Sequence, residues 1–384
     1  MHEIRRAVAT DPSSALALDA VLSATQAAGS ELTILFCSAR RNLAEINRWL
    51  KERGRALPLI GATSAGEITP QGYLAGSVTA VSFPPRFFKA ATARIEGLGD
   101  FKLSQASQAV RAARKALAAK LPRFDARRCF AILLVDGTAY CEESLVAALA
   151  AELDGIPLIG GSAAYDWPDP DPKRSQRLRT CVLHGGRWHT RCAVLALIHT
   201  RLPWQTFTHN HYVASPTKAV ITAADSARRR VFEINGLPAA PTYARLCGLP
   251  RTPRTALDFS AHPAMVSIGG QWFPRGVLKL HPDRSLEFAC AIEQGLVVSV
   301  GRSGPMLNKL RTALEDIEAQ LGPLALVLAF DCAGRRVTMD EEGIRPRIEA
   351  LLQRHNAIGL STLGEQYNAI HMNHSFTAVA IGGE

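Results

Sequence analysis

Three segments of this chain repeat one order of residue types. Each has an apolar stretch, a glycine, small and hydroxyl-bearing residues, and then a carboxylate; the three segments are residues 57–67, 156–166 and 356–365. Each one follows an apolar stretch and a stretch with helical periodicity, and each precedes further stretches of strand length. An internal repeat of one strand–helix–strand unit explains all three segments.

The order of these elements predicts a mixed α/β fold. A helix between two strands favours parallel neighbours, whereas the stretches after each turn alternate like antiparallel strands. Two of the later stretches, 181–183 and 192–198, are expected to form a hairpin. We therefore predict mixed sheets with flanking helices in two related halves, as domains 1–200 and 201–384.

Composition supports a folded chain without membrane spans. Hydrophobic residues make up 47% of the 384 residues and charged residues 20%, so a sizeable core can be buried. No apolar run approaches the ~18 residues of a membrane helix, and the N-terminus lacks the apolar part of a secretory signal. The eight cysteines include no C-x-x-C pair, so reduced thiols are expected. These features predict a cytoplasmic protein.

The net charge of +10 predicts a negatively charged ligand or partner. The basic residues come as scattered pairs and one triplet, 228–230, without interleaved aromatic residues. Neither nucleic acid nor a membrane is therefore an expected partner. An acidic surface on a partner protein is the expected match, and a merely solvated basic surface is the alternative.

The ends of the repeated segments carry the first candidate ligand groups. A small-residue turn at a strand end lets a ligand approach backbone N–H groups, and a hydroxyl adds a donor. Ser64, Glu67, Ser361 and Glu365 therefore predict a ligand pocket, although the same residues can instead cap local backbone groups. A third interpretation is an α/β enzyme in which Glu67 and Glu365 act as acid and base; neither a phosphate-binding loop nor a serine-hydrolase elbow accompanies them.

Four histidines in two short motifs are the second candidate. His209 and His211 are two residues apart, so in a strand both imidazoles would point to one face. Such a pair can bind a metal, and one member can ligate a haem iron. His371 and His374 follow the third turn and form the other motif. For both motifs, structural or solvated histidines are the simpler alternative.

The repeated segments resemble the FIST family, bacterial sensory proteins with an N-terminal and a C-terminal FIST half. The resemblance spans almost the whole chain and rests on the runs 61–67, 155–162 and 359–368, the last reading GLSTLGEQYN. Further runs resemble the branch called NosP, a haem-containing nitric oxide sensor; they read INGLPAA from residue 234, HPAMVSIGG from 262 and FACAIEQGLV from 288.

The resemblance implies a sensor without enzymatic activity. It implies a b-type haem, for which His211 is the expected iron ligand and His209 the alternative, with Tyr212 lining the haem slot. It also implies nitric oxide as the signal and, as partner, a histidine kinase, a diguanylate cyclase or a phosphodiesterase that influences biofilm behaviour; a homodimer is compatible with this role. FIST proteins outside the branch sense small ligands such as amino acids, so a haem-free sensor is the alternative.

Overall fold

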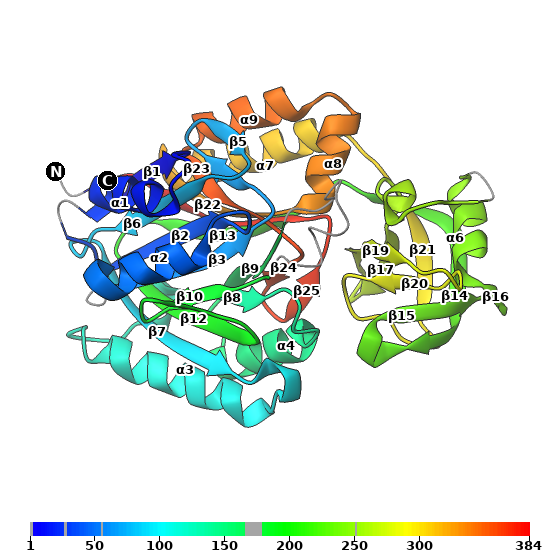
Figure 1. Ribbon diagram of the computed structural model, residues 1–384, viewed down its shortest axis with the longest axis horizontal. Coiled ribbons are helices and arrows are strands. Elements are labelled where there is room, and N and C mark those ends of the chain that lie inside the picture. Colours follow the sequence, from blue (N-terminus) through cyan, green and yellow to red (C-terminus); the bar gives the residue numbers. More distant parts are fainter. Residues whose placement is uncertain (1–2, 27–28, 55–56, 166–178, 250–251) are drawn as a thin grey trace.

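The computed structural model describes residues 3–26, 29–54, 57–165, 179–249 and 252–384. These residues form a large α/β body and a smaller β lobe beside it (Figure 1). None of the described helices combines the length and the hydropathy that a membrane span needs.

The body contains three copies of one unit. Each copy has an edge strand, a helix, two strands joined by a helical segment, a hairpin and a returning strand. The first copy consists of β1 (Arg5–Ala9), α1 (Ser14–Gln26), β2 (Leu32–Ser38), α2 (Leu43–Trp49), β3 (Leu59–Ser64), β4 (Glu67–Thr69), β5 (Gly72–Leu74) and β6 (Val78–Phe83). The second consists of β7 (Phe88–Glu96), α3 (Leu103–Ala118), β8 (Cys129–Asp136), α4 (Glu142–Leu153), β9 (Leu158–Ala163), β10 (Val182–His184), β11 (Arg187–His189) and β12 (Cys192–Thr200). The third consists of β13 (Trp204–His209), α7 (Met306–Leu321), β22 (Leu324–Cys332), α8 (Ala333–Glu341), α9 (Arg345–Arg354), β23 (Ala357–Thr362), β24 (Glu365–Tyr367), β25 (Ile370–Met372) and β26 (Phe376–Gly382).

Each copy builds one mixed sheet and lends its hairpin to the sheet of another copy. The strands β2 and β3, β8 and β9, and β22 and β23 run parallel, and the returning strand of each copy pairs antiparallel with the first of them. The hairpin β4–β5 joins the third sheet, β10–β11 the first, and β24–β25 the second. The expected mixed α/β fold is confirmed, and the unit occurs three times.

One expected pairing is wrong. The stretches 181–183 and 192–198 do not form a hairpin with each other: β10 pairs with β11 and β3, whereas β12 pairs with β7 and β8. Alternating or apolar residues mark a strand, but they do not name its partner.

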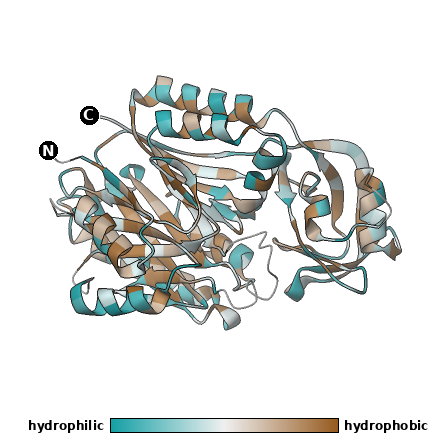
Figure 2. Cartoon of the chain, turned by 45° about the horizontal axis from the view of Figure 1, so that its top comes forward, coloured by the Kyte–Doolittle hydropathy of each residue, from teal (hydrophilic) through white to brown (hydrophobic). Residues whose placement is uncertain are grey.

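A shared core lies between the three sheets. Their inner faces meet in one cluster, in which Phe36 of the first sheet and Phe330 of the third pack edge to face with ring centres 6.4 Å apart. The outer faces are covered by α1 and α2, by α3 and α4, and by α7 and α9. Hydrophobic residues accordingly concentrate on the strands, and hydrophilic ones on the outer sides of the helices (Figure 2).

The three strand ends meet in a closed ring of backbone hydrogen bonds. The N–H groups of Ala65, Ala164 and Leu363, one residue beyond β3, β9 and β23, donate to the carbonyls of Ser361, Thr63 and Ser162 at 3.0, 2.8 and 3.2 Å. These atoms occupy equivalent places in the three copies. The ring therefore brings together the turns that the sequence marks as repeated.

The lobe interrupts the third copy between β13 and α7. Its sheet has the order β18-β17-β21-β14-β15-β20-β19, with β16 beside β15, and its core surrounds Tyr243, Phe259 and Phe288. Its elements are β14 (Val213–Asp225), β15 (Arg230–Ile234), β16 (Leu237–Pro238), α6 (Ala239–Cys247), β17 (Ala264–Ile268), β18 (Gln271–Arg275), β19 (Val277–Leu280), β20 (Leu286–Phe288) and β21 (Val297–Arg302). The chain thus crosses between body and lobe twice, at residues 210–212 and 303–305.

Candidate functional site

The turn after β3 holds a buried carboxylate. Glu67 is fully buried and accepts a hydrogen bond from the Ser64 hydroxyl. The hydroxyl and the backbone N–H of Ser77 donate to its other oxygen at 2.6 and 3.0 Å. Both carboxylate oxygens are therefore engaged within the same copy.

The turn after β23 repeats this arrangement. Glu365 is fully buried and accepts from the Thr362 hydroxyl, while Ser375 donates its hydroxyl and its N–H at 2.6 and 3.1 Å. In the second copy the carboxylate of the repeated segment, Asp166, lies outside the described residues, and Val182 occupies the strand position that Glu67 and Glu365 have in the other copies. Arg191, which stands directly before the returning strand as Ser77 and Ser375 do, donates its backbone N–H to Asp136 at the end of β8 at 2.5 Å, and the Thr180 hydroxyl donates to the same carboxylate.

Neighbouring charges give the two buried carboxyl groups different pKa values. Burial raises the pKa of Glu67 to about 6, against the opposing effects of its hydroxyl donors and of Arg336. Burial also raises the pKa of Glu365, to about 8, and the nearby Asp331 carboxylate adds to the rise. At neutral pH, Glu67 is therefore mostly ionised and Glu365 mostly protonated.

The structure buries all five residues that the sequence marks as pocket candidates, Ser64, Glu67, Tyr212, Ser361 and Glu365. None of them lines any of five cavities found among the described residues. Glu67 and Glu365 lie on hairpins that pair with different sheets, beside β23 and β9. An acid–base pair would need both carboxyls to face one cavity, which this arrangement does not provide.

A small cavity of about 20 Å³, room for about one water molecule, lies where the third copy meets the lobe; we call it the junction cavity. The body contributes residues at the carboxyl ends of β22 and β23 and before β26: Cys332, Ala333, Gly334, Thr362, Leu363, Asn373 and His374. The lobe contributes Gly276, Val277, Leu278 and Ala289. The carboxyl ends of parallel strands and the contacts between domains are both common places for ligands. The lobe residues carry no chemical motif, so the sequence offered no signal for this cavity.

His374 forms the polar part of the cavity wall. Its backbone has φ 51°, a left-handed conformation that is uncommon outside glycine. Its ring lies between two glycines, because a Cβ added at Gly276 or Gly334 would come within 2.7 Å of it. Its Nδ1 is 3.2 Å from the Tyr212 hydroxyl, and burial, followed by the Arg335 charge, lowers the pKa of His374 to about 4. His374 is therefore a neutral group held in one position.

Behind His374, the first crossing between body and lobe packs on a buried arginine. The Arg335 guanidinium is paired with Asp331 at 2.6 Å and lies 3.2 Å from Nδ1 of His211. Because a guanidinium only donates, Nδ1 of the neutral His211 accepts, and its proton is on Nε2. Within the described part of the chain, Nε2 of His211, Nη2 of Arg335 and both ring nitrogens of His209 have no hydrogen-bond partner. Burial and the Arg335 charge lower the pKa of both histidines, that of His209 to about 3.

Comparison with known families decides the identity of the chain. The model of the FIST N domain matches residues 31–237, more than half of the chain, and that of the FIST C domain matches residues 239–368. The chain belongs to the FIST family. It is a FIST-domain sensor protein of signal transduction, and the broad identification made from the repeated turns is confirmed.

Other comparisons add little to the FIST assignment. No curated protein matches the chain. Among solved structures, the cyanuric acid hydrolase from A. caulinodans is similar over 100% of both chains, at 10% sequence identity and a TM-score of 0.37. A similarity of this size carries no argument about activity.

The NosP resemblance implies haem, and the surroundings of His211 can be tested against that group. An iron ligand needs a free lone pair on one ring nitrogen, with the proton on the other nitrogen donated to an acceptor. At His211 this order is reversed, since Arg335 donates to Nδ1 and Nε2 carries the proton. Neither His209 nor His211 lines any of the five cavities. As placed, these residues do not fit a haem, although their unpaired nitrogens mark them as unusual.

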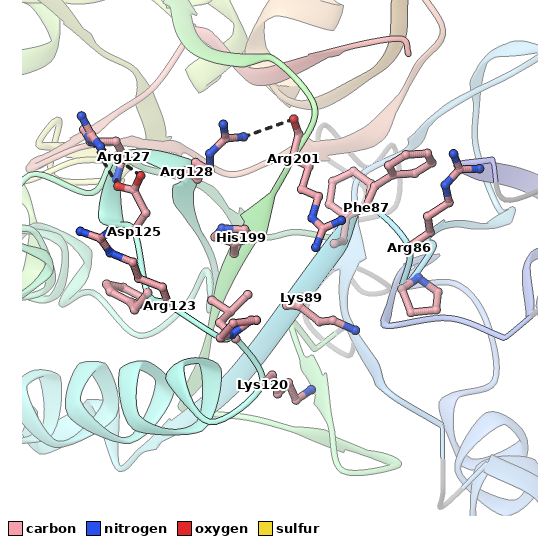
Figure 3. A pocket seen from close by; sticks show the side chains of 15 residues that line it. Arg86, Phe87, Lys89, Lys120, Arg123, Asp125, Arg127, Arg128, His199 and Arg201 are labelled. Carbon is pink, nitrogen blue, oxygen red and sulfur yellow. Dashed lines mark hydrogen bonds and ion pairs between the residues drawn. The ribbon is translucent and has the colours of Figure 1, made fainter.

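The FIST protein also has a basic cavity of about 920 Å³ on the body, around β7, β12 and the end of α3 (Figure 3). Its cationic lining residues are Arg86, Lys89, Lys120, Arg123, Arg127, Arg128 and Arg201. Four of them pair with the carboxylates of Glu31, Asp125 or Glu384. Among the described residues, Arg123, Arg128 and Arg201 are exposed and have no carboxylate partner. The cavity thus brings together seven of the basic residues that contribute to the positive net charge of the chain.

Proposed function

We propose that this FIST protein senses a small polar ligand at the junction cavity, without catalytic turnover, and that the lobe moves away from the body to widen this small cavity when the ligand enters. The observation that carries the proposal is the origin of the cavity wall: strand ends of the third copy form one side and lobe residues the other. A ligand that bridges both sides favours one position of the lobe over others, which is the differential contact that a sensor requires.

The transmitting element is the first crossing, residues 210–212. Tyr212 contacts His374 from one side and packs against His211 with ring centres 4.0 Å apart. His211 in turn contacts Arg335, which is anchored to β22 through Asp331. A ligand at His374 is therefore connected through Tyr212 to the segment that joins the lobe to the body, and from there through His211 and Arg335 to β22.

A ligand with acceptor oxygens suits this region best. Nη2 of Arg335 and Nε2 of His211 are buried donors without partners among the described residues, and unpaired buried donors are costly. Neither donor lines the junction cavity, so a ligand carboxylate, as in a free amino acid, would reach them only when the first crossing shifts. We therefore favour the haem-free amino-acid sensor over the other interpretations.

Haem-dependent nitric oxide sensing through His211, with His209 in reserve, is the second candidate. The unpaired Nε2 of His211 favours it, as does the resemblance of three sequence runs to NosP. It requires that Arg335 stops donating to Nδ1, so the present arrangement supports it less than the first candidate.

The signal leaves through a partner protein, a histidine kinase or an enzyme of cyclic-di-GMP metabolism, at the basic cavity. The exposed Arg123, Arg128 and Arg201 favour an acidic partner surface. Regulation of the partner should then weaken as salt rises, since exposed charges are screened beyond ~10 Å at 0.1 M. Regulation that does not depend on salt would contradict this part of the proposal.

Two measurements on the purified full chain test the proposal. In a thermal-shift screen of the twenty free amino acids, one or more should raise Tm, and Thr362→Ala should reduce that shift. In parallel, haem is added and the visible spectrum recorded. A ligated Soret band that His211→Ala abolishes, together with no amino-acid shift, would replace the first candidate by the second. No response to either probe would contradict both.

A further inference from the structure

We propose that Glu143, Cys290 and His371 form a zinc-binding site that ties the lobe to the body. One ligand atom of each residue, a carboxylate oxygen, Sγ and a ring nitrogen, lies within 4.8 Å of the other two. Oxygen, sulfur and nitrogen donors in this combination are typical of zinc, whereas Mg²⁺ and Ca²⁺ prefer oxygen donors alone. The inference goes beyond the proposed function, because it concerns a different set of residues and a different ligand.

The three residues come from distant parts of the chain. Glu143 lies in the first turn of α4 in the second copy, and His371 lies on β25 in the third. Cys290 follows β20 of the lobe and is fully buried. A metal at this point would therefore join two copies of the body to the lobe, next to Ala289 and Asn373 of the junction cavity.

Each of the three side chains is also held by a neighbour, as metal ligands usually are. The backbone N–H of Ala291 and Nη2 of Arg229 donate to the Glu143 carboxylate at 2.5 and 2.7 Å. The Cys290 thiol donates to Oδ1 of Asn373 at 2.8 Å, and this proton is released when the thiolate binds zinc. These contacts orient the carboxylate and the thiol before any ion is bound.

The Gln366 amide orients the imidazole of His371. It lies 3.1 Å from Nδ1, which leaves Nε2 to face the cluster. Its own Oε1 has no partner in the described part of the chain. Turning this amide over would place Oε1 on Nδ1–H, which is the partner that a histidine bound to zinc through Nε2 needs.

The charges of the cluster balance with one divalent cation. Glu142, Glu143 and a Cys290 thiolate carry three negative charges, and Arg229 bonds both carboxylates at 2.5 and 2.7 Å. One guanidinium leaves two negative charges, which Zn²⁺ neutralises. Three protein ligands also leave a fourth position for water, as in zinc sites that are not closed.

An ion-pair network without metal is the competing arrangement. In it, a protonated His371 balances the second carboxylate: burial lowers its pKa, but the Cys290 and Glu143 charges outweigh burial and raise it to about 9. The two arrangements differ in whether a metal is bound, so metal binding decides between them.

The test is a titration of the full chain, freed of metal by a chelator, with ZnCl2 and separately with CoCl2. One equivalent of each should bind, and the cobalt form should show the near-ultraviolet charge-transfer band of a cobalt–thiolate bond. Cys290→Ser and His371→Ala should each lower the affinity for zinc at least tenfold. Cys247→Ser, a half-buried lobe cysteine outside the cluster, should leave the affinity unchanged.

Absence of zinc binding, or binding that Cys290→Ser and His371→Ala leave intact, would overturn the proposal. If these variants do not fold, Gln366→Ala keeps it testable, because loss of a residue that orients a ligand typically lowers metal affinity by about 10–100-fold. An amino-acid response that survives in the metal-free protein would leave the proposed function standing independently of this outcome.

Discussion

The turns that carry Glu67 and Glu365 have the same backbone and the same pattern of hydroxyl donors, yet they differ in their electrostatic surroundings. Burial raises both pKa values, but Arg336 near the first carboxylate opposes the rise and Asp331 near the second adds to it, so the pKa values are about 6 and about 8. The third turn also borders the lobe, through Thr362 and Leu363, whereas the described residues of the first turn line none of the five cavities. Repetition thus preserves the local fold, and the surroundings decide which copy is available for function.

The likeness of the copies is tested most severely at three equivalent glycines. A Cβ added at Gly61, Gly160 or Gly359 would overlap the backbone carbonyl of Leu35, Leu133 or Ala329 on the neighbouring parallel strand. We expect each glycine-to-alanine change to lower the free energy of unfolding by about 3–5 kcal/mol, because backbone must shift in a packed sheet.

Chemical denaturation of the three variants measures this loss. Gly236→Ala in the lobe is the matched control: its φ of 74° also favours glycine, but nothing lies within 4 Å of the added Cβ. This change should lower the free energy of unfolding by about 1 kcal/mol. A copy that tolerates its alanine would not be equivalent to the others.

The difference between the two carboxyls is tested by Glu67→Gln and Glu365→Gln. Both folded pKa values lie above the unfolded value of about 4.3. Between those values the folded state holds a proton that the unfolded state has lost, so stability falls as pH rises, until the folded pKa is passed. Glu67 completes this loss near pH 6, whereas Glu365 continues to lose stability up to about pH 8.

Glutamine does not titrate, so each Glu-to-Gln change removes the pH-dependent loss of stability at its own position. At pH 8, Glu365→Gln should therefore be the more stable variant by about 1–3 kcal/mol, at up to about 1.4 kcal/mol for each unit of pKa difference. This difference in stability between the two variants should vanish by pH 5, where both carboxyls are mostly protonated in the folded state. Urea denaturation between pH 5 and pH 8 measures it, and a gap that does not change with pH would show that the two carboxyls titrate alike.

Arg336→Met should make the first turn more like the third. Arg336 lowers the pKa of Glu67, and its Nη1 donates to the carbonyl of Ala65 at 2.6 Å. Without this charge the pKa of Glu67 should rise, by less than about one unit, since burial is the main cause of its shift. Carbon-13 NMR of labelled glutamate detects the change, and Glu365 in the same spectrum serves as the internal reference.

Much of the body could be predicted from local patterns. The strand Leu32–Ser38 is a largely apolar run, the helix Met306–Leu321 repeats apolar residues at helical spacing, and the repeated turns meet in one ring. The exchange of hairpins between copies could not be predicted, because a short strand does not encode which sheet it joins. Local patterns also do not show that residues 213–302 fold apart from the elements on either side.

The candidate site was predictable only in part. The sequence marks His211, His371 and His374 as unusual, but the contacts of His211 with Arg335 and of His374 with two glycines join residues far apart in the chain. The same holds for Cys290, which meets His371 only because the lobe folds against the third copy. Chemistry at a junction depends on tertiary contacts, which periodicity and spacing do not contain.

The most direct test of the account compares Thr362→Ala with Ser64→Ala in the thermal-shift screen of free amino acids. The two hydroxyls make the same hydrogen bond in equivalent turns, but only Thr362 lines the junction cavity. We expect the ligand-induced rise in Tm to be strongly reduced in Thr362→Ala and unchanged in Ser64→Ala. Equal rises in both variants, or a rise lost only in Ser64→Ala, would contradict the junction as the ligand site.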